Sequence, residues 1–385
     1  MICLSILLRK IDLHWRSTIL PFVWKYKGRL TKKGEKMIEK KLHWRTHLFL
    51  NARTNKQLST SLICKDTLLT EVIENPVYTK FTIPKKSGGF RIIQAPDENL
   101  KRIQKKLSFV LNDLYVPNEN SHGFVKKSKK TSYHTLSNAK AHIGKNFVWN
   151  IDITDFFSSI PTAAVAANLM EPPFKFVAEK AKYIALLICY KKQLPTGSPC
   201  SPIVSNIVCN ILDKKIQFWV NDLNKTYENL HLIYTRYADD ITFSSSDQLS
   251  NIQKQEVYDI LAEYGFVVNA KKNREQHKLQ AQWVTGIKVN EKPNLDRKYI
   301  RNIRAVLHQM KKNGIEESTA KYLETTQEVS ILDIEKFLNV IKGRIAYLGF
   351  VKGKEDANYM KFKNEIGEYV NICYGAFGKI SFGKV

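Results

Sequence analysis

"TRYADDITFS", residues 235–244, places two adjacent carboxylates, Asp239 and Asp240, between two short runs of β-type residues. The run before them, residues 229–237, is rich in residues that favour strands, and "ITFSSS" resumes the same pattern after them. The pattern predicts a β-hairpin with both acids at its tip. Because two adjacent acids each raise the cost of ionising the other, we expect cations beside them.

A second predicted strand ends at another acid. Residues 146–152, "NFVWNID", form a nearly continuous apolar run that ends at Asp152, and Asp155 follows three residues later. Asp152 can therefore meet Asp239 and Asp240 at the ends of the strands. Two Mg²⁺ ions roughly 4 Å apart would neutralise such carboxylates and stabilise the attacking and leaving oxygens of a phosphoryl transfer. An isolated Asp-Asp pair is more often a simple turn, so this interpretation depends on the flanking motifs.

Composition favours a polyanionic partner. The 385 residues include 61 lysines and arginines against 36 acids, which gives a net charge of +25. Such a balance is typical of proteins that bind nucleic acid or an anionic surface, although a merely soluble basic surface is the simpler alternative. The length allows two or three domains, and the 43% hydrophobic content is that of a globular protein.

The six cysteines are scattered without a C-x-x-C pair, which argues against a zinc site and a disulfide framework and favours reduced thiols in a cytoplasmic protein. The apolar run that begins the chain has eight residues before Arg9 and Lys10, too few to span a membrane, and no membrane segment follows. Residues 1–45 form a basic extension with interleaved aromatics, as in a nucleic-acid-binding arm. An alternative is that translation starts at Met37.

Two further segments have a recognisable local pattern, a basic turn and the start of a helix. In "PKKSGGFR", residues 84–91, Gly88 and Gly89 permit a tight hairpin turn. Lys85, Lys86 and Arg91 place cationic donors where a triphosphate could be held; a solvated basic hairpin is the alternative. Further on, Ser201 and Pro202 are typical of the N-cap and first position of a helix whose apolar stripe belongs to a core.

In this order along the chain, the motifs resemble a reverse transcriptase over most of residues 55–350. The segments that carry the resemblance are 84–104 ("PKKSGGFRIIQAPDENLKRIQ"), 150–160 ("NIDITDFFSSI"), 193–217 ("QLPTGSPCSPIVSNIVCNILDKKIQ"), 237–240 ("YADD"), 264–273 ("YGFVVNAKKN") and 283–289 ("WVTGIKV"). The resemblance implies an α+β right-hand polymerase with fingers, a palm built on an antiparallel sheet, and a helical thumb. It also implies that Asp152, Asp239 and Asp240 are the catalytic residues and arrange two Mg²⁺ ions.

The resemblance and the periodicity together predict the domains. We expect a basic N-terminal extension at 1–45, fingers at 46–145, a palm at 146–290 in which 161–200 joins the fingers, and a helical thumb with a C-terminal tail at 291–385. Residues 296–314 and 332–350 have the apolar spacing of two thumb helices.

The resemblance also implies a pocket for a nucleotide. Phe157 matches the residue under the sugar, where its ring would collide with a ribose 2′-OH and favour deoxynucleotides. Thr196 and Gly197 stand where many relatives carry Gln-Gly, so the nucleotide contact of that loop departs from the family pattern. Lys272 matches the lysine that assists departure of pyrophosphate, and Lys271 is nearly as good a candidate. Lys85, Lys86 and Arg91 complete the predicted pocket.

Two short motifs indicate the type of reverse transcriptase. Asn138, Ala139 and His142 form an N-A-x-x-H pattern, and Val284, Thr285 and Gly286 form V-T-G; both resemble signatures of bacterial retron enzymes, and we expect them at an RNA-binding surface. The resemblance implies a cognate noncoding RNA as template and primer, a single-stranded DNA product made from dNTPs, priming from an RNA 2′-hydroxyl, and an accessory effector in phage defence. Because only 35 residues follow residue 350, ribonuclease H is expected to be a separate protein. Alternatives are an intron-linked or abortive-infection reverse transcriptase and a catalytically silent RNA-binding scaffold.

Overall fold

The computed structural model describes residues 42–85, 88–128 and 132–377, so almost all of the predicted basic extension at 1–45 and the whole of Lys86 lie outside it. The chain divides into two compact units. The first unit extends to His134 and also holds Asn150–Phe243 and Gln248–Arg274; the second holds Thr135–Trp149, Ser244–Asp247 and the chain from Glu275 onward. This division follows contacts within the chain, and the domain boundaries at 45, 145 and 290 remain predictions.

A four-stranded sheet carries the acids. Its strand order is β4 (Ile233–Tyr237), β5 (Asp240–Ser245), β3 (Phe147–Asp152) and β6 (Arg274–His277). Residues 148, 149, 151 and 152 of β3 are buried, as its continuous apolar run predicts. Together with the helices described below, this sheet confirms the α+β class and the antiparallel hairpin around residues 238–239.

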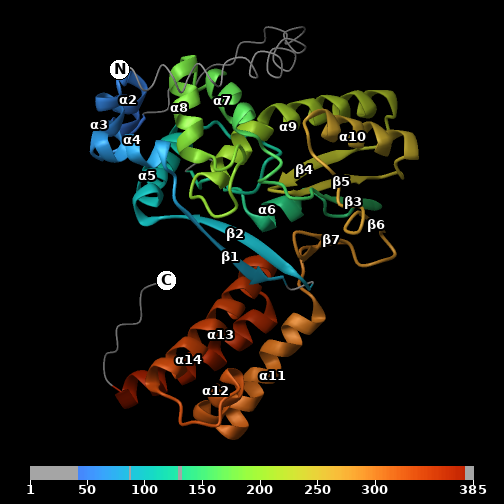
Figure 1. Cartoon of the computed structure of the whole chain (residues 1–385). Coiled ribbons are helices and arrows are strands. Elements are labelled where there is room, and N and C mark those ends of the chain that lie inside the picture. The colour runs from blue at the N-terminus through green and yellow to red at the C-terminus, as the bar shows by residue number, and fades with distance from the viewer. Residues whose placement is uncertain (1–41, 86–87, 129–131, 378–385) are drawn as a thin grey trace. The chain divides into compact units, whose positions relative to one another are not determined.

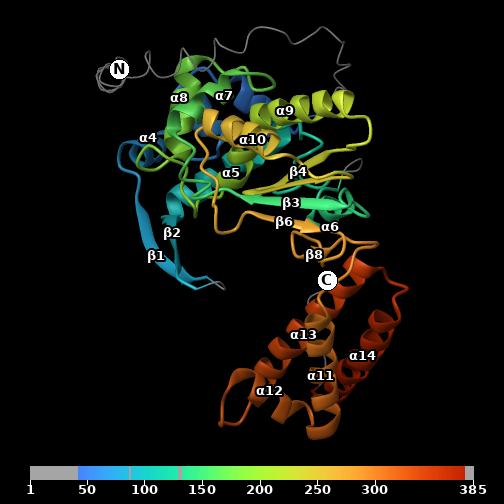
Figure 2. The same ribbon diagram turned by 90° about the vertical axis from the view of Figure 1, so that its right-hand side faces the viewer.

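The first unit also contains a set of helices. They are α2 (Trp44–Asn51), α3 (Asn55–Ser61), α4 (Asp66–Glu74), α5 (Glu98–Leu114), α7 (Thr162–Met170), α8 (Ala178–Ile188), α9 (Ser201–Thr226) and α10 (Asn251–Glu263). Both α9 and α10 lie on the same face of β4 and β5 (Figures 1 and 2). Pro202 lies in the first turn of α9, where its missing N–H costs nothing, but the N-cap is Cys200 and not the predicted Ser201.

A two-stranded ribbon extends from the helices of the first unit (Figure 2). It pairs β1 (Tyr78–Pro84) with β2 (Phe90–Pro96) in antiparallel register, with Tyr78 opposite Pro96 and Pro84 opposite Phe90. Gly88 and Gly89 have φ angles of +85° and +77°, a conformation that glycine adopts at little cost. The predicted basic hairpin is therefore present, with its turn at the glycines.

The second unit contains α6 (Thr135–Lys140), the short strands β7 (Trp283–Val284) and β8 (Ile287–Lys288), and the helices α11 (Arg297–Asn313), α12 (Ile315–Leu323), α13 (Ile331–Lys352) and α14 (Ala357–Phe377). The last four helices lie side by side (Figure 2) around one apolar core. The predicted helices at 296–314 and 332–350 match α11 and α13, whereas α12 and α14 were not predicted. No helix in the described parts of the chain is long and apolar enough to cross a membrane.

Candidate active site

The structure brings the three aspartates together at the turn between β4 and β5. Ala238, at the turn, has a φ angle of +59°, and Asp239 and Asp240 follow it directly. The backbone N–H of Ile153, one residue beyond Asp152, donates to the carbonyl oxygen of Asp239 at 3.2 Å. The end of β3 is thereby fixed beside the turn, and the predicted meeting of strand ends is present in the fold.

The electrostatics of the three acids show that they act on one another. Burial raises the pKa of Asp239 above its ordinary value, and the nearby charge of Asp152 raises it further. Asp240 is exposed, but the protein around its carboxyl desolvates it. This desolvation and, to a lesser extent, the charges of Asp239 and Asp152 raise the pKa of the carboxyl to about 6. Carboxylates that disfavour each other's ionised form are suited to binding a cation.

Asp152 already has a cationic partner in the chain. Lys272 Nζ lies 2.9 Å and 3.0 Å from its two carboxylate oxygens, and Asn269 Nδ2 donates to Oδ2 at 3.2 Å. The loop that carries both residues is held to β3 by backbone bonds, including one from Asn269 N to the carbonyl of Asp152 at 2.8 Å. The bond to Asp152 raises the pKa of Lys272, so the ammonium holds its proton more tightly while the ion pair is intact.

The donor set fits a hard divalent cation, because three carboxylates supply the oxygen ligands that Mg²⁺ prefers. The raised pKa values of Asp239 and Asp240, to which the charge of Asp152 contributes in both cases, are the electrostatic sign of that fit. Within the part of the chain that the structure describes, however, no three His, Cys, Asp or Glu side chains are gathered closely enough to hold a metal as they stand. A cation that takes both oxygens of Asp152 must displace Lys272.

Phe157 lies half-buried on an aromatic base. Its ring centroid is 5.4 Å from that of Phe156 and 6.1 Å from that of Phe124, and Phe156 in turn stacks on Phe266 at 5.7 Å. Aromatic pairs at such distances hold each other in defined orientations. The predicted sugar-contacting ring is therefore held by Phe156 beside it and by Phe124 from another segment, and Phe266 supports Phe156.

The loop of Thr196 and Gly197 is pressed against β2. Both residues are half-buried, and a Cβ added to Gly197 would lie 2.4 Å from the carbonyl oxygen of Gln94. The next residue, Ser198, is buried and donates to Gln104 Oε1 at 2.8 Å, which ties the loop to α5. Only glycine fits at position 197, and it joins the loop to the basic ribbon.

Two of the three predicted cationic residues of the ribbon, Lys85 and Arg91, lie within the described residues. Lys85 and Arg91 are both exposed, and Lys85 N donates to the carbonyl of Gly89 across the turn at 2.9 Å. The positive charge of Arg91 lowers the pKa of Asp239, so its guanidinium acts within electrostatic range of the acids. Lys86 lies outside the described residues.

In the second unit, the two signature motifs pack on each other. Thr285 Oγ1 donates to the carbonyl of Thr135 at 3.1 Å, and Leu136, Ala139 and Val284 share one apolar core. Asn138, His142 and Val284 are fully buried, with His142 Nδ1 2.7 Å from Ser244 Oγ, whereas Thr285 is half-buried and Gly286 exposed. Of the five predicted RNA-binding residues, Thr285 and Gly286 are thus the ones at the surface.

Sequence reasoning missed a buried polar network behind the turn that carries Asp239 and Asp240. Arg236 is fully buried and forms an ion pair with the equally buried Asp213 of α9 at 2.7 Å. Arg274 was missed as well; its positive charge offsets part of the rise in the pKa of Asp240. A charged residue within an otherwise β-type run is the one signal that could have identified Arg236.

Comparison with known proteins agrees with this geometry. Residues 83–350 match the family model described as reverse transcriptase (RNA-dependent DNA polymerase). The chain is 32% identical over 255 residues to the retron Mx65 reverse transcriptase of Myxococcus xanthus, a match that covers 60% of this chain and 56% of the relative. It is 31% identical over 235 residues to the retron Ec86 reverse transcriptase of Escherichia coli, which covers 60% and 69%. The chain thus spans little more than half the length of the first of these relatives.

Among solved structures, telomerase from Candida albicans in complex with a fragment of telomeric RNA matches with a TM-score of 0.43 and 11% identity, over 80% of this chain and 66% of that chain. The family match covers more than half of the present chain. The chain belongs to the reverse transcriptase family.

Proposed function

We propose that this chain is an RNA-directed DNA polymerase that copies part of a cognate structured RNA into single-stranded DNA. The observation that carries the proposal is the meeting of Asp152, Asp239 and Asp240 at strand ends, with the pKa of Asp239 and that of Asp240 raised by desolvation and by the neighbouring carboxylates. In the reaction, a primer hydroxyl attacks the α-phosphorus of a dNTP, a phosphodiester bond forms, and pyrophosphate leaves.

Asp152, Asp239 and Asp240 are the residues that would hold divalent cations, which we take to be two Mg²⁺ ions. When bound, such ions supply charge stabilisation to the attacking and leaving oxygens. The side chains of the protein contribute the remaining steps. Lys272, whose ammonium is bonded to Asp152, can release that carboxylate and give a proton to the departing pyrophosphate.

Residues of the first unit would bind the nucleotide. The exposed Lys85 and Arg91, with Lys86 beside them in sequence, supply donors for the triphosphate. The ring of Phe157, held by Phe124 and Phe156, would exclude a ribose 2′-OH. Thr196 and Gly197, in the loop that contacts β2, would contact the nucleotide.

The similarity to retron reverse transcriptases supports a proposal for the primer, the product and the partner proteins. We propose that a 2′-hydroxyl of the cognate RNA is the primer, that the product is an RNA-linked DNA, and that a separate ribonuclease H removes copied RNA. We further propose that an accessory effector protein works with this enzyme in bacterial defence against phage. A cytoplasmic location is part of the same proposal, and the scattered cysteines of the sequence favour it.

For recognition of the cognate RNA we propose the α6 and β7–β8 segments of the second unit. Thr285 and Gly286 would face the RNA, because they are the members of the two motifs that reach the surface. Asn138, His142 and Val284 would hold this surface in shape from inside, since they are fully buried.

The test is synthesis by the purified protein on the RNA encoded beside its gene, with labelled dNTPs. Wild-type protein is expected to give DNA that stays linked to RNA until a debranching enzyme or ribonuclease treatment releases it. Asp239→Asn keeps the size of the side chain and removes a ligand charge, so it should lower synthesis at least roughly 100-fold while RNA binding stays within about two-fold. Near-normal synthesis by this variant would refute the assignment of the active site.

A further inference from the structure

Arg236 is the largest side chain that the described structure buries completely. A guanidinium carries five N–H donors and a permanent charge, so its burial is costly unless every donor finds an acceptor. It lies on β4, three residues before Asp239. An apolar side chain would fill the same space in the core without that cost, which indicates that the charge has a use.

All five donors of Arg236 are occupied. Nε and Nη2 form a bidentate pair with the two oxygens of Asp213 at 2.8 Å and 2.7 Å, and Nη2 also donates to Ser121 Oγ at 3.2 Å. Nη1 donates to Asn206 Oδ1 and to the carbonyl oxygen of Ala238, each at 3.2 Å. Four of the five bonds end within the core, and the fifth ends on the catalytic turn.

Ala238 is the residue whose backbone must be held. Its φ angle of +59° is a left-handed conformation that costs a non-glycine residue on the order of 1 kcal/mol, and Asp239 follows it directly. On its other side, a Cβ added to Gly123 would lie 2.6 Å from the nitrogen of Ala238. The turn is therefore confined by the 120–123 segment on one side and by the guanidinium on the other.

The same segment is fastened to β4 through its backbone. Arg236 N donates to the carbonyl of Asn120, and His122 N donates to the carbonyl of Arg236, both at 2.8 Å. Asn206 of α9 closes the arrangement, because its Nδ2 donates to the carbonyl of Gly123 at 2.7 Å while its Oδ1 accepts from Ser121 Oγ at 3.2 Å. Helix α9, β4 and residues 120–123 thus meet at one guanidinium.

We propose that Arg236 is a positioning residue for catalysis: through its bond to the Ala238 carbonyl, it fixes the left-handed turn that presents Asp239 and Asp240. Asp213 of α9 is the anchor that orients the guanidinium. The inference rests on the proposed polymerase function and adds to it the part of the fold that holds the catalytic carboxylates in place.

An apolar replacement of the whole ion pair separates this role from simple stability. Replacing a buried pair by well-packed apolar residues is often neutral for stability, whereas removing one partner leaves an uncompensated charge. Tyr234 must be changed as well, because its hydroxyl donates to Asp213 Oδ1 at 2.7 Å. In Arg236→Met/Asp213→Leu/Tyr234→Phe, Ser121 and Asn206 keep their bond to each other, and the Ala238 carbonyl loses its side-chain donor.

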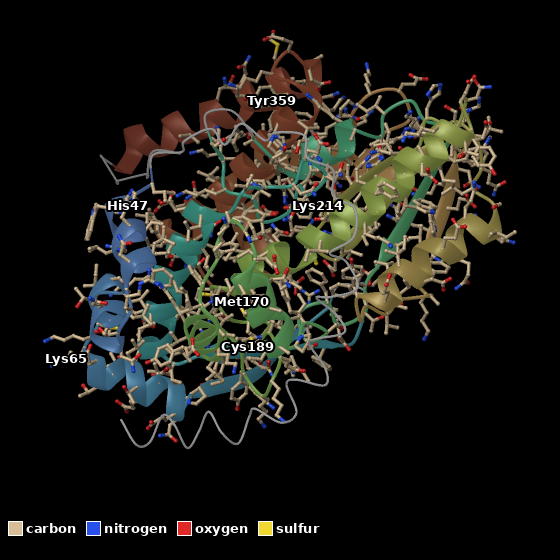
Figure 3. The ribbon with its side chains drawn as sticks, turned by 90° about the horizontal axis from the view of Figure 1, so that it is seen from above. His47, Lys65, Met170, Cys189, Lys214 and Tyr359 are labelled. Carbon is tan, nitrogen blue, oxygen red and sulfur yellow. The ribbon has the colours of Figure 1, made fainter. Side chains whose placement is uncertain are left out.

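The experiment measures the unfolding temperature, the Kd for a primed RNA template, and kcat and KM for dNTP in the full chain. The single variant Arg236→Met should unfold about 6–10 °C lower than wild type. The triple variant should recover most of that loss and bind the template within about two-fold of wild type, yet its kcat should stay roughly 10- to 100-fold lower. Lys214→Met is the matched control, since Lys214 follows Asp213 on α9 and is exposed (Figure 3).

Arg236→Lys covers the case in which the triple variant does not fold. Lysine keeps the charge opposite Asp213 but cannot also reach the Ala238 carbonyl in a planar fork, so kcat should fall about 10-fold with little change in KM for dNTP. A triple variant or Arg236→Lys with wild-type kcat would overturn the positioning role. Failure of wild-type protein itself to extend a primer would instead refute the proposed function.

Discussion

Lys272 forms an ion pair with Asp152 in which its ammonium contacts both carboxylate oxygens, at 2.9 Å and 3.0 Å. The side chain of Asp152 is 12% exposed and that of Lys272 is 56% exposed, so the lysine can leave toward solvent more easily than the carboxylate can move. A lysine in this position competes with any metal that Asp152 binds. Its release from Asp152 and its availability as a proton donor are then the same event.

The first prediction follows from that competition. Lys272→Ala should bind Mn²⁺, used as a spectroscopic probe for Mg²⁺, about 2- to 5-fold more tightly than wild type in the absence of nucleotide, because a partly exposed ion pair is worth at most about 1 kcal/mol. Electron paramagnetic resonance of free Mn²⁺ measures this directly. Lys271→Ala, which removes the neighbouring exposed charge, should leave the affinity unchanged. Equal affinities of wild type and Lys272→Ala would show that the pair does not compete with metal.

The second prediction concerns pH. The pKa of Asp240 is raised to about 6 in the folded chain, so its ionised form destabilises the fold, and this penalty grows from about pH 4 and is complete above about pH 6. In EDTA, Asp240→Asn should therefore stabilise the protein at pH 8 by about 1 kcal/mol, since solvent screens an exposed carboxylate, and by much less at pH 4.5.

Thermal unfolding across this pH range checks the second prediction. The Asp240→Asn variant is expected to unfold about 2 °C higher than wild type at pH 8. Mg²⁺ should stabilise wild type more than the variant, because the ion removes the repulsion that the substitution also removes. Asp222→Asn, on the exposed face of α9, is the control that removes a carboxylate away from the three aspartates. A variant that is less stable than wild type at pH 8 would contradict the electrostatic argument.

The third prediction concerns Gly197 and the ribbon. An alanine Cβ at this position would lie 2.4 Å from the carbonyl oxygen and 2.7 Å from the carbonyl carbon of Gln94, and backbone atoms cannot yield as the end of a side chain can. Gly197→Ala should push the loop away from β2 and raise KM for dNTP about 10-fold, as steady-state kinetics can show. Gly343→Ala has open space within α13 and should leave KM unchanged while raising the unfolding temperature slightly.

The turn at Asp239 and Asp240 and the main helices could be predicted because their signals are local. Asp239 and Asp240 follow a β-type run, and α11 and α13 have apolar spacing that can be recognised within a few turns. The predicted α+β class is confirmed by the sheet and helices of the structure, and the predicted family is confirmed by the family match. Helix α14 lies beyond the two predicted thumb helices, and the burial of residues such as Phe362 in the core of the second unit comes from tertiary contacts.

The sequence could not reveal which residues far apart in the chain contact each other in the fold. Arg236 and Asp213 lie 23 residues apart on a strand and a helix, and no local pattern states that they pair. The same holds for Gly197, whose need for glycine comes from β2 about a hundred residues earlier in the chain. Asn138 and His142 were predicted at an RNA surface from their motif, but their burial depends on how α6 packs on β7 and β8.

The fourth prediction tests the sugar contact. Phe157→Ala should raise incorporation of ribonucleotides relative to deoxynucleotides about 10-fold or more, because the ring that would collide with the 2′-OH is gone. Phe124→Ala should shift the same ratio in the same direction but less, since its ring lies 6.1 Å from that of Phe157 and orients it. Phe218→Ala removes a ring that is 71% exposed on α9 and serves as the control. An unchanged ratio in Phe157→Ala would show that another residue excludes ribonucleotides.

The fifth prediction concerns the exposed turn of the V-T-G motif. Gly286 has a φ angle of +78° and open space where a Cβ would lie, and aspartate and asparagine are the side chains that tolerate this conformation best. If the turn faces RNA phosphates, Gly286→Asp should weaken binding of the cognate RNA about five-fold more than the uncharged Gly286→Asn. The difference should shrink as salt is raised, because it comes from charge repulsion.

Gly265 offers a matched control, since its φ angle is also +78° and its Cβ would likewise meet nothing within 4 Å, but it lies in the first unit after α10. Gly265→Asp should leave the affinity for the cognate RNA within about two-fold of wild type, as measured by filter binding at several salt concentrations. Equal losses in the Asp variants of Gly286 and Gly265 would indicate general repulsion of RNA by added negative charge. Equal affinities of Gly286→Asp and Gly286→Asn would remove the V-T-G turn from the RNA-binding surface, and the motif would then act through the packing of α6 alone.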